Sequence, residues 1–97
     1  MPHYIMLFRY TQKGAENIKA SPARLDAAKK GIEAAGGKIK GFYLTMGQYD
    51  AVSIVELPND DAAAKLALAT ASQGNIRGET LRAFTEEEYR KLIASLP

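Results

Sequence analysis

A four-residue stretch near the middle of the chain, Gly47-Gln48-Tyr49-Asp50, constrains the arrangement of everything around it. Residues 42–46 precede it and residues 51–57 follow it, and both segments are short, apolar and rich in β-branched or aromatic side chains. Two such segments joined by a glycine-containing turn are typical of a β-hairpin. The sequence therefore predicts a pair of antiparallel strands at the centre of the fold.

Strand patterns also occur near both ends of the chain. In residues 3–10, tyrosine, methionine and phenylalanine alternate with isoleucine and leucine, so both faces of this predicted strand are apolar. Residues 76–84 carry a weaker strand pattern, because glycine and charged residues interrupt it. Apolar residues on both faces indicate that both faces of the sheet are covered.

Three helical patterns lie between or after these strands. Ser21 as N-cap, followed by proline, predicts a helix that ends at the two glycines 36–37. Asn59 and the acidic residues after it predict a second, alanine-rich helix. A capping box, with Thr85 as N-cap and Glu88 three residues later, predicts a last helix to about residue 95.

The resulting order is β-α-β-β-α-β plus a C-terminal helix, which is the ferredoxin-like arrangement of an α+β domain. We expect one domain over residues 1–97, with a four-stranded antiparallel sheet, its first and third strands in the middle and both helices on one face. The opposite face would be bare although its residues are apolar. Two such faces packed together would give a homodimer or higher homo-oligomer of the dimeric α/β-barrel type.

The composition of the chain excludes several classes of function. The net charge of +2 is small and the lysines are spread out, so we do not expect nucleic-acid binding. The absence of cysteine and the single histidine, His3, exclude thiol chemistry, a triad and a multi-histidine metal site within one chain. No apolar run approaches the ~20 residues that span a bilayer, and the N-terminus lacks a signal-peptide pattern. We expect a cytoplasmic protein with no cofactor, bound metal or membrane contact.

The predicted strand pairing gathers polar residues at one end of the sheet. They are Arg9, Tyr10, Tyr49, Asp50 and Arg77. In one interpretation Asp50 is an ionised ligand-binding group, because a neighbouring arginine lowers the pKa of a carboxyl group. In the other, Asp50 only fixes the turn by bonding its own backbone, and the turn glycine supplies a positive φ.

At the other end of the sheet, His3 and Tyr4 would approach Glu56 and Arg82. Glu56 is unusual because it follows two apolar residues on one strand face. His3 and Glu56 would suit a general base and its orienting partner. Alternatively, Glu56 forms an ion pair with Arg82 or lies at a solvated strand end near Pro58.

Aromatic residues on the predicted strands offer a third candidate. Tyr4, Phe8, Tyr10, Phe42 and Tyr43 would line a cavity between the sheet and the helices or between subunits, or belong to the core or an interface. No catalytic residue is assigned. The candidate residues for binding a small apolar or aromatic ligand are Tyr4, Tyr43, Tyr49, Asp50 and Glu56.

The motif Gly-x-Tyr-Asp, formed by Gly47, Tyr49 and Asp50, resembles the signature of the GYD-domain family. The surrounding segments, residues 21–24, 41–47, 55–58 and 74–77, resemble it too, and the resemblance extends from Tyr4 to about Phe84. It implies a small bacterial-type domain with a ferredoxin-like, dimeric α/β-barrel fold. It implies no catalytic residues.

Three functions fit these observations. The first, which we expect, is a homo-oligomeric accessory domain that binds a small, partly apolar molecule without catalysis. The second is a cofactor-independent enzyme, resembling a monooxygenase or an isomerase, which rests on fold analogy. An enzyme would need a buried polar residue aimed into a pocket, such as His3, Tyr43 or Glu56. The third is a purely structural assembly domain.

Overall fold

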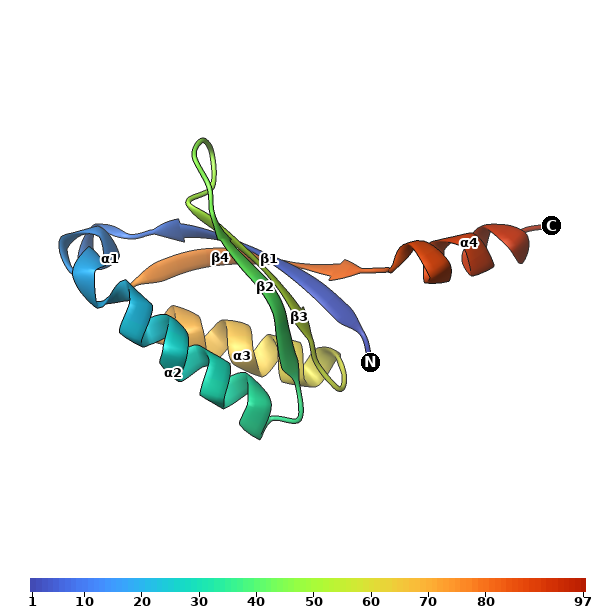
Figure 1. Cartoon of the computed structure of the whole chain (residues 1–97), viewed down its shortest axis with the longest axis horizontal. Helices are drawn as coiled ribbons and strands as arrows, with labels where there is room; N and C mark the ends of the chain where they lie inside the picture. Colours follow the sequence, from blue (N-terminus) through green and yellow to red (C-terminus); the bar gives the residue numbers. More distant parts are fainter.

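In the computed structural model, which describes residues 1–97, an antiparallel sheet carries helices on one of its faces (Figure 1). The strands are paired in the order β2-β3-β1-β4, with β1 and β3 in the middle as predicted. The α+β, ferredoxin-like fold expected from the sequence is therefore confirmed. The strand bounds are His3–Tyr10 for β1, Lys38–Leu44 for β2, Ala51–Glu56 for β3 and Ile76–Ala83 for β4.

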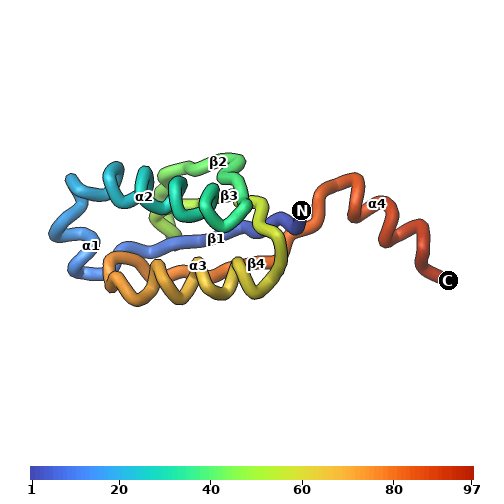
Figure 2. The backbone as a smooth tube through the Cα atoms, turned by 90° about the horizontal axis from the view of Figure 1, so that it is seen from below, coloured from blue at the N-terminus to red at the C-terminus, as the bar shows by residue number.

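The helix layer consists of two long helices that run beside each other under the sheet (Figure 2). A short helix and a 3₁₀ turn lead into the first of them, and a last helix follows β4. None of the helices combines the length and the apolar character that crossing a membrane requires. The bounds are Gln12–Glu16 for α1, Ile18–Ala20 for η1, Ser21–Ala34 for α2, Asp60–Ser72 for α3 and Glu86–Ala94 for α4.

The start of α2 differs from the prediction. Ser21 is the first helical residue rather than the N-cap, and the cap position is Ala20, whose side chain makes no capping bond. The η1 turn runs directly into the helix, and the backbone N–H of Ser21 donates to the carbonyl of Ile18. A side-chain cap is therefore not needed, and the Ser21 hydroxyl is free for other contacts.

The other two predicted helix starts are confirmed. The Asn59 side chain accepts a hydrogen bond from the Ala62 N–H at 2.9 Å. Both bonds of the capping box are present at α4, between Thr85 and Glu88. The N–H of Thr85 donates to the Glu88 carboxylate at 2.9 Å, and this bond lowers the pKa of Glu88 because it favours the charged form.

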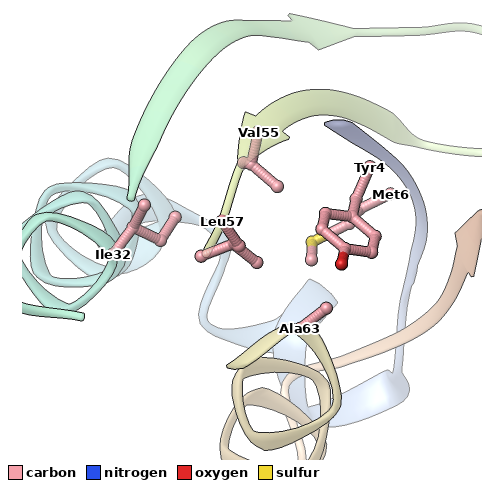
Figure 3. Packing of buried hydrophobic residues seen from close by; sticks show 6 residues of the cluster. All are labelled: Tyr4, Met6, Ile32, Val55, Leu57 and Ala63. Carbon is pink, nitrogen blue, oxygen red and sulfur yellow. The ribbon is translucent and has the colours of Figure 1, made fainter. Parts of the chain in front are cut away.

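The hydrophobic core lies between the sheet and the helix layer. Figure 3 shows side chains from β1, α2, the β3 end and α3 pointing toward one another. The phenol of Tyr4 is buried here and donates to the Asp60 carboxylate at 2.5 Å. Burial raises the pKa of Tyr4, and the bond to Asp60 raises it further. The core cluster is Tyr4, Met6, Ile32, Val55, Leu57 and Ala63.

The opposite face of the sheet has no helix over it (Figure 1), and we call it the open face. Its positions alternate with the core positions along β1, β3 and β4, and the strand register places them side by side. The apolar side chains are partly exposed, so this face is bare and apolar as predicted. Its central residues are Ile5, Leu7, Val52, Ile54 and Leu81.

Helix α4 stands clear of both layers and extends the molecule to 52 Å (Figures 1 and 2). It follows β4 after only two residues, Phe84 and Thr85, and the capping box fixes where it begins. Its apolar side chains recur three and four residues apart and each is at least half exposed. This α4 stripe consists of Tyr89, Leu92 and Ile93 of the helix together with Leu96, which lies two residues beyond its end.

The packing of α1 against the start of β4 generates a stability prediction. Gly14 is buried, and a Cβ there would lie 1.9 Å from the backbone oxygen of Asn75. We expect Gly14→Ala to lower the free energy of unfolding by about 1–3 kcal/mol, because the backbone has to shift to admit the methyl group.

Gly31→Ala is the matched control: nothing lies within 4 Å of its Cβ position. It should raise stability by about 0.5–1 kcal/mol through helix propensity. Urea unfolding measures both, and a wild-type midpoint for Gly14→Ala would contradict the packing of α1.

Candidate functional site

A cavity of about 340 Å³ lies between the sheet and helices α2 and α3. Thirteen of its 20 lining residues are hydrophobic. Its volume falls at the lower end of the range for small-molecule sites, and a mainly apolar wall with a few polar groups is typical of them. The cavity is therefore the leading candidate for a functional site.

The cavity exists because short side chains face it from the helices. Ala27, Ala28 and Gly31 line it from α2, and Ala69 lines it from α3. On the sheet side, Ser53 occupies the middle of β3 and is only 4% exposed. These small residues leave space that larger side chains would fill.

The polar lining residues come mainly from the end of the cavity where β1 ends and α2 begins. Tyr10 is the last residue of β1 and pairs in register with Ile76, the first residue of β4. The Tyr10 hydroxyl lies 3.4 Å from the Ser21 hydroxyl, at the start of α2. Arg24 lies one turn further along α2. The polar lining residues are Tyr10, Ser21, Arg24, Ser53, Thr70, Gln73 and Asn75.

The loop of the central hairpin is tied to β1 through Asp50. Its carboxylate accepts a hydrogen bond from the Tyr10 N–H at 2.9 Å, and its own N–H donates to the Phe8 carbonyl at 2.8 Å. The expectation that Asp50 bonds its own turn is therefore wrong. The pairing of β1 with β3 ends at Phe8 and Ala51, so the N–H of Tyr10 lies beyond this ladder and needs another acceptor. Gly47 has the predicted positive φ, +127°.

The other residues predicted at this end also meet, but on the open face. The Arg9 guanidinium lies over the Tyr49 ring, 4.8 Å from its centroid, and the Arg9 Nε donates to the Gln48 carbonyl at 2.8 Å. The Tyr49 hydroxyl donates to the Glu79 carboxylate at 3.1 Å. Arg77 is the register partner of Arg9 on β4. These contacts hold the hairpin loop against the end of β1.

His3 and Glu56 form a pair at the other end of the open face. The His3 Nε2 lies 3.0 Å from the Glu56 carboxylate, and the Lys40 ammonium lies 4.0 Å from the same oxygen. The alternative of a Glu56–Arg82 ion pair is wrong. Arg82 is the register partner of Tyr4, so it shares the helix-side face, and its guanidinium lies over the rings of Tyr4 and Phe84.

The five residues predicted to bind a ligand do not converge on the cavity. Tyr4 belongs to the core cluster, and Asp50 ties the hairpin loop to β1. Tyr43, which is 61% exposed, is the register partner of Val52 on the open face. Tyr49 and Glu56 also make their contacts on that face, with Glu79 and His3.

Among the aromatic residues considered for a cavity, Phe8, Tyr10 and Phe42 do line it. Except for Tyr10, the polar lining residues were not predicted from the sequence, above all Arg24 and Ser53. The sequence could have indicated Ser53, because this polar residue interrupts the alternation of buried apolar residues along β3. Nothing in the sequence singles out Arg24, since an arginine near the start of a helix is an ordinary surface residue. No group of three or more histidine and acidic side chains lies close enough to hold a metal ion.

Comparisons with known proteins agree with this fold. A family model described as the GYD domain matches residues 4–93. A protein from Thermus thermophilus, named "Glutamine synthetase and cystathionine beta-lyase binding protein", is 32% identical over 84 residues, which cover 86% of this chain and 88% of that protein. The crystal structure of TTHA0845 from the same organism superposes with a TM-score of 0.55 at 23% identity, covering 88% of this chain and 95% of that one.

The role of Asp50 generates a second prediction. Asp50→Ala should lower the free energy of unfolding by about 1–3 kcal/mol, because the Tyr10 N–H loses its acceptor. Asp50→Asn is the matched control, since its amide oxygen can still accept that bond. Thermal unfolding followed by circular dichroism compares the two variants. An unchanged melting temperature for Asp50→Ala would show that the loop does not depend on this bond.

Proposed function

This chain belongs to the GYD-domain family, and we propose that it is a homo-oligomeric accessory protein that binds a small, mainly apolar molecule. The cavity between the sheet and helices α2 and α3 is the observation that carries the proposal. An engineered apolar cavity of about 150 Å³ binds benzene. A cavity of about 340 Å³ would by this measure hold a ligand of roughly a dozen non-hydrogen atoms.

The composition of the cavity wall supports binding over catalysis. Proton transfer in enzymes is most often performed by a histidine or a carboxylate within reach of the substrate. Neither occurs among the lining residues. The His3–Glu56 pair, which would suit a general base, lies on the open face, so the sheet separates it from the cavity. The pair and the cavity cannot act on one small molecule within the same protomer.

The Thermus thermophilus relative supports an accessory role. Its name describes a protein that binds two enzymes. By analogy, we propose that the present chain binds other proteins and influences their activity, and that it is not itself an enzyme. A ligand in the cavity would then report a metabolic state to such a partner.

Self-association is the second part of the proposal. The open face carries half-buried apolar side chains from three strands, including Leu7, Ile54 and Leu81, and no part of the chain covers them. Burial of such a face removes apolar surface from water. A second copy is the occupant that we propose, because a two-fold dimer pairs one surface patch with the same patch of the partner and would cover both open faces at once.

Helix α4 supports the same interface. Its apolar stripe, residues 89–96, is exposed, and the two-residue link after β4 directs it away from its own sheet (Figure 1). In this position the helix does not cover the open face of its own chain. In a two-fold dimer it would instead lie against the partner, so each copy supplies an apolar helix and receives one.

Ligand binding can be tested with a neutral apolar probe. Isothermal titration with 1-octanol should show saturable binding to the wild-type protein. Ala28→Leu should weaken it about tenfold or more, because the added side chain occupies the cavity. Ala34→Leu is the matched control on the same helix, since Ala34 is exposed and does not line the cavity. Equal binding by both variants would contradict the assignment of the cavity.

Self-association predicts a mass of two or more chains in native mass spectrometry. Ile54→Lys should give monomers that remain folded. Ile54 lies on the open face, so association would bury the charge of the introduced lysine in the interface. Leu68→Lys is the matched control on the exposed side of α3 and should leave the assembly intact. An Ile54→Lys protein that stays associated would exclude the open face as the interface.

A further inference from the structure

We infer that the ligand of the cavity is an amphipathic monoacid, a small molecule with an apolar body and one carboxylate, and that Arg24 binds the carboxylate. This inference rests on the proposed binding function and names the chemical class of the ligand. Its basis is the uneven distribution of charge and polarity around the cavity wall.

Arg24 is the only charged residue among the 20 that line the cavity. None of the ion pairs in the chain includes it. A charge that is partly withdrawn from water beside apolar side chains is normally paired, because its desolvation is otherwise uncompensated. The chain supplies no anion to Arg24, so an anionic ligand would complete the site.

The hydrogen bonds of Arg24 lead to the same conclusion. Its Nη1 donates to the Asn17 carbonyl at 3.1 Å, which anchors the side chain at the start of α2. Its Nη2 is shielded from solvent and has no acceptor in the chain. A guanidinium group has five N–H donors in a planar fork that matches a carboxylate. The guanidinium therefore has donors in excess of the acceptors that the protein provides.

The neighbours of Arg24 make this end of the cavity polar. Ser21 lies one turn before it on α2, and the Tyr10 hydroxyl lies 3.4 Å from the Ser21 hydroxyl. The bond from Asp50 to the Tyr10 N–H fixes the end of β1 that carries this phenol. One of the two hydroxyls donates to the other, and the hydroxyl that accepts keeps its own O–H, which can donate a hydrogen bond to an oxygen of the ligand.

The other end of the cavity is apolar. Ile32 lies near the end of α2, and Ile39 pairs in register with Val55, which in turn pairs with Tyr4 of the core cluster. Leu66 and Met6 complete this part of the wall. A ligand with its carboxylate at Arg24 would therefore place its apolar body over the short side chains in the middle of the helices.

Octanoate and 1-octanol are a matched pair of probes, because they share the alkyl chain and differ in the charged group. In isothermal titration near pH 8, the wild-type protein should bind octanoate at least about tenfold more tightly than 1-octanol, as expected for charge-assisted hydrogen bonds. Arg24→Gln should remove this preference while 1-octanol binding is retained. Arg90→Gln is the control, since Arg90 is exposed on α4 and pairs with Glu86.

The outcomes separate this inference from the proposed function. Equal wild-type affinities for octanoate and 1-octanol, or an octanoate preference that survives Arg24→Gln, would overturn the inference and leave cavity binding in place. Failure of both probes to bind the wild-type protein would overturn both. The wild-type comparison needs no variant, so a folding defect in Arg24→Gln would not prevent the test.

Discussion

The short side chains on α2 and α3 are the constraint on which the rest of the structure depends. Protein interiors normally pack to the density of organic crystals. Here Ala27, Ala28 and Gly31 on one helix and Ala69 on the other line the cavity, and their short side chains leave it unfilled. The core cluster fills only the end of the layer near Tyr4 and Leu57. The core cluster therefore fills one end of the space between the sheet and the helices, and the cavity occupies the rest of it.

A strict division between the two sheet faces follows from the alternation of side chains along the strands. The helix-side face holds the core and the cavity, whereas the open face holds the polar contacts of the hairpin loop and the His3–Glu56 pair. Asp50 connects the two systems, because its carboxylate holds the backbone of Tyr10 while the Tyr10 side chain lines the cavity. The motif at the centre of the sequence therefore shapes the cavity without lining it.

Sequence reasoning reached the fold more reliably than the site. The Asn59 and Thr85 caps and the apolar residues on both sheet faces follow from local patterns, the strand order follows from the ferredoxin-like arrangement that these patterns indicate, and each is present. The proposed pairing of Glu56 with Arg82 failed because the two residues lie on strands on either side of β1 and belong to opposite faces of the sheet: Glu56 pairs in register with His3, and Arg82 with Tyr4. The assignment of Ser21 as a cap failed because η1 satisfies its backbone N–H first.

By itself the sequence determined the order of the elements, the strand alternation and the apolar character of both faces, because these depend on residues close together in the chain. Only the tertiary structure decided that the Asp50 carboxylate bonds to β1 rather than to its own turn. It alone brought Tyr10, Ser21 and Arg24 to one end of a cavity. The shape of that cavity depends on how far two helices lie from a sheet, and this distance is set by packing between residues that are remote in sequence.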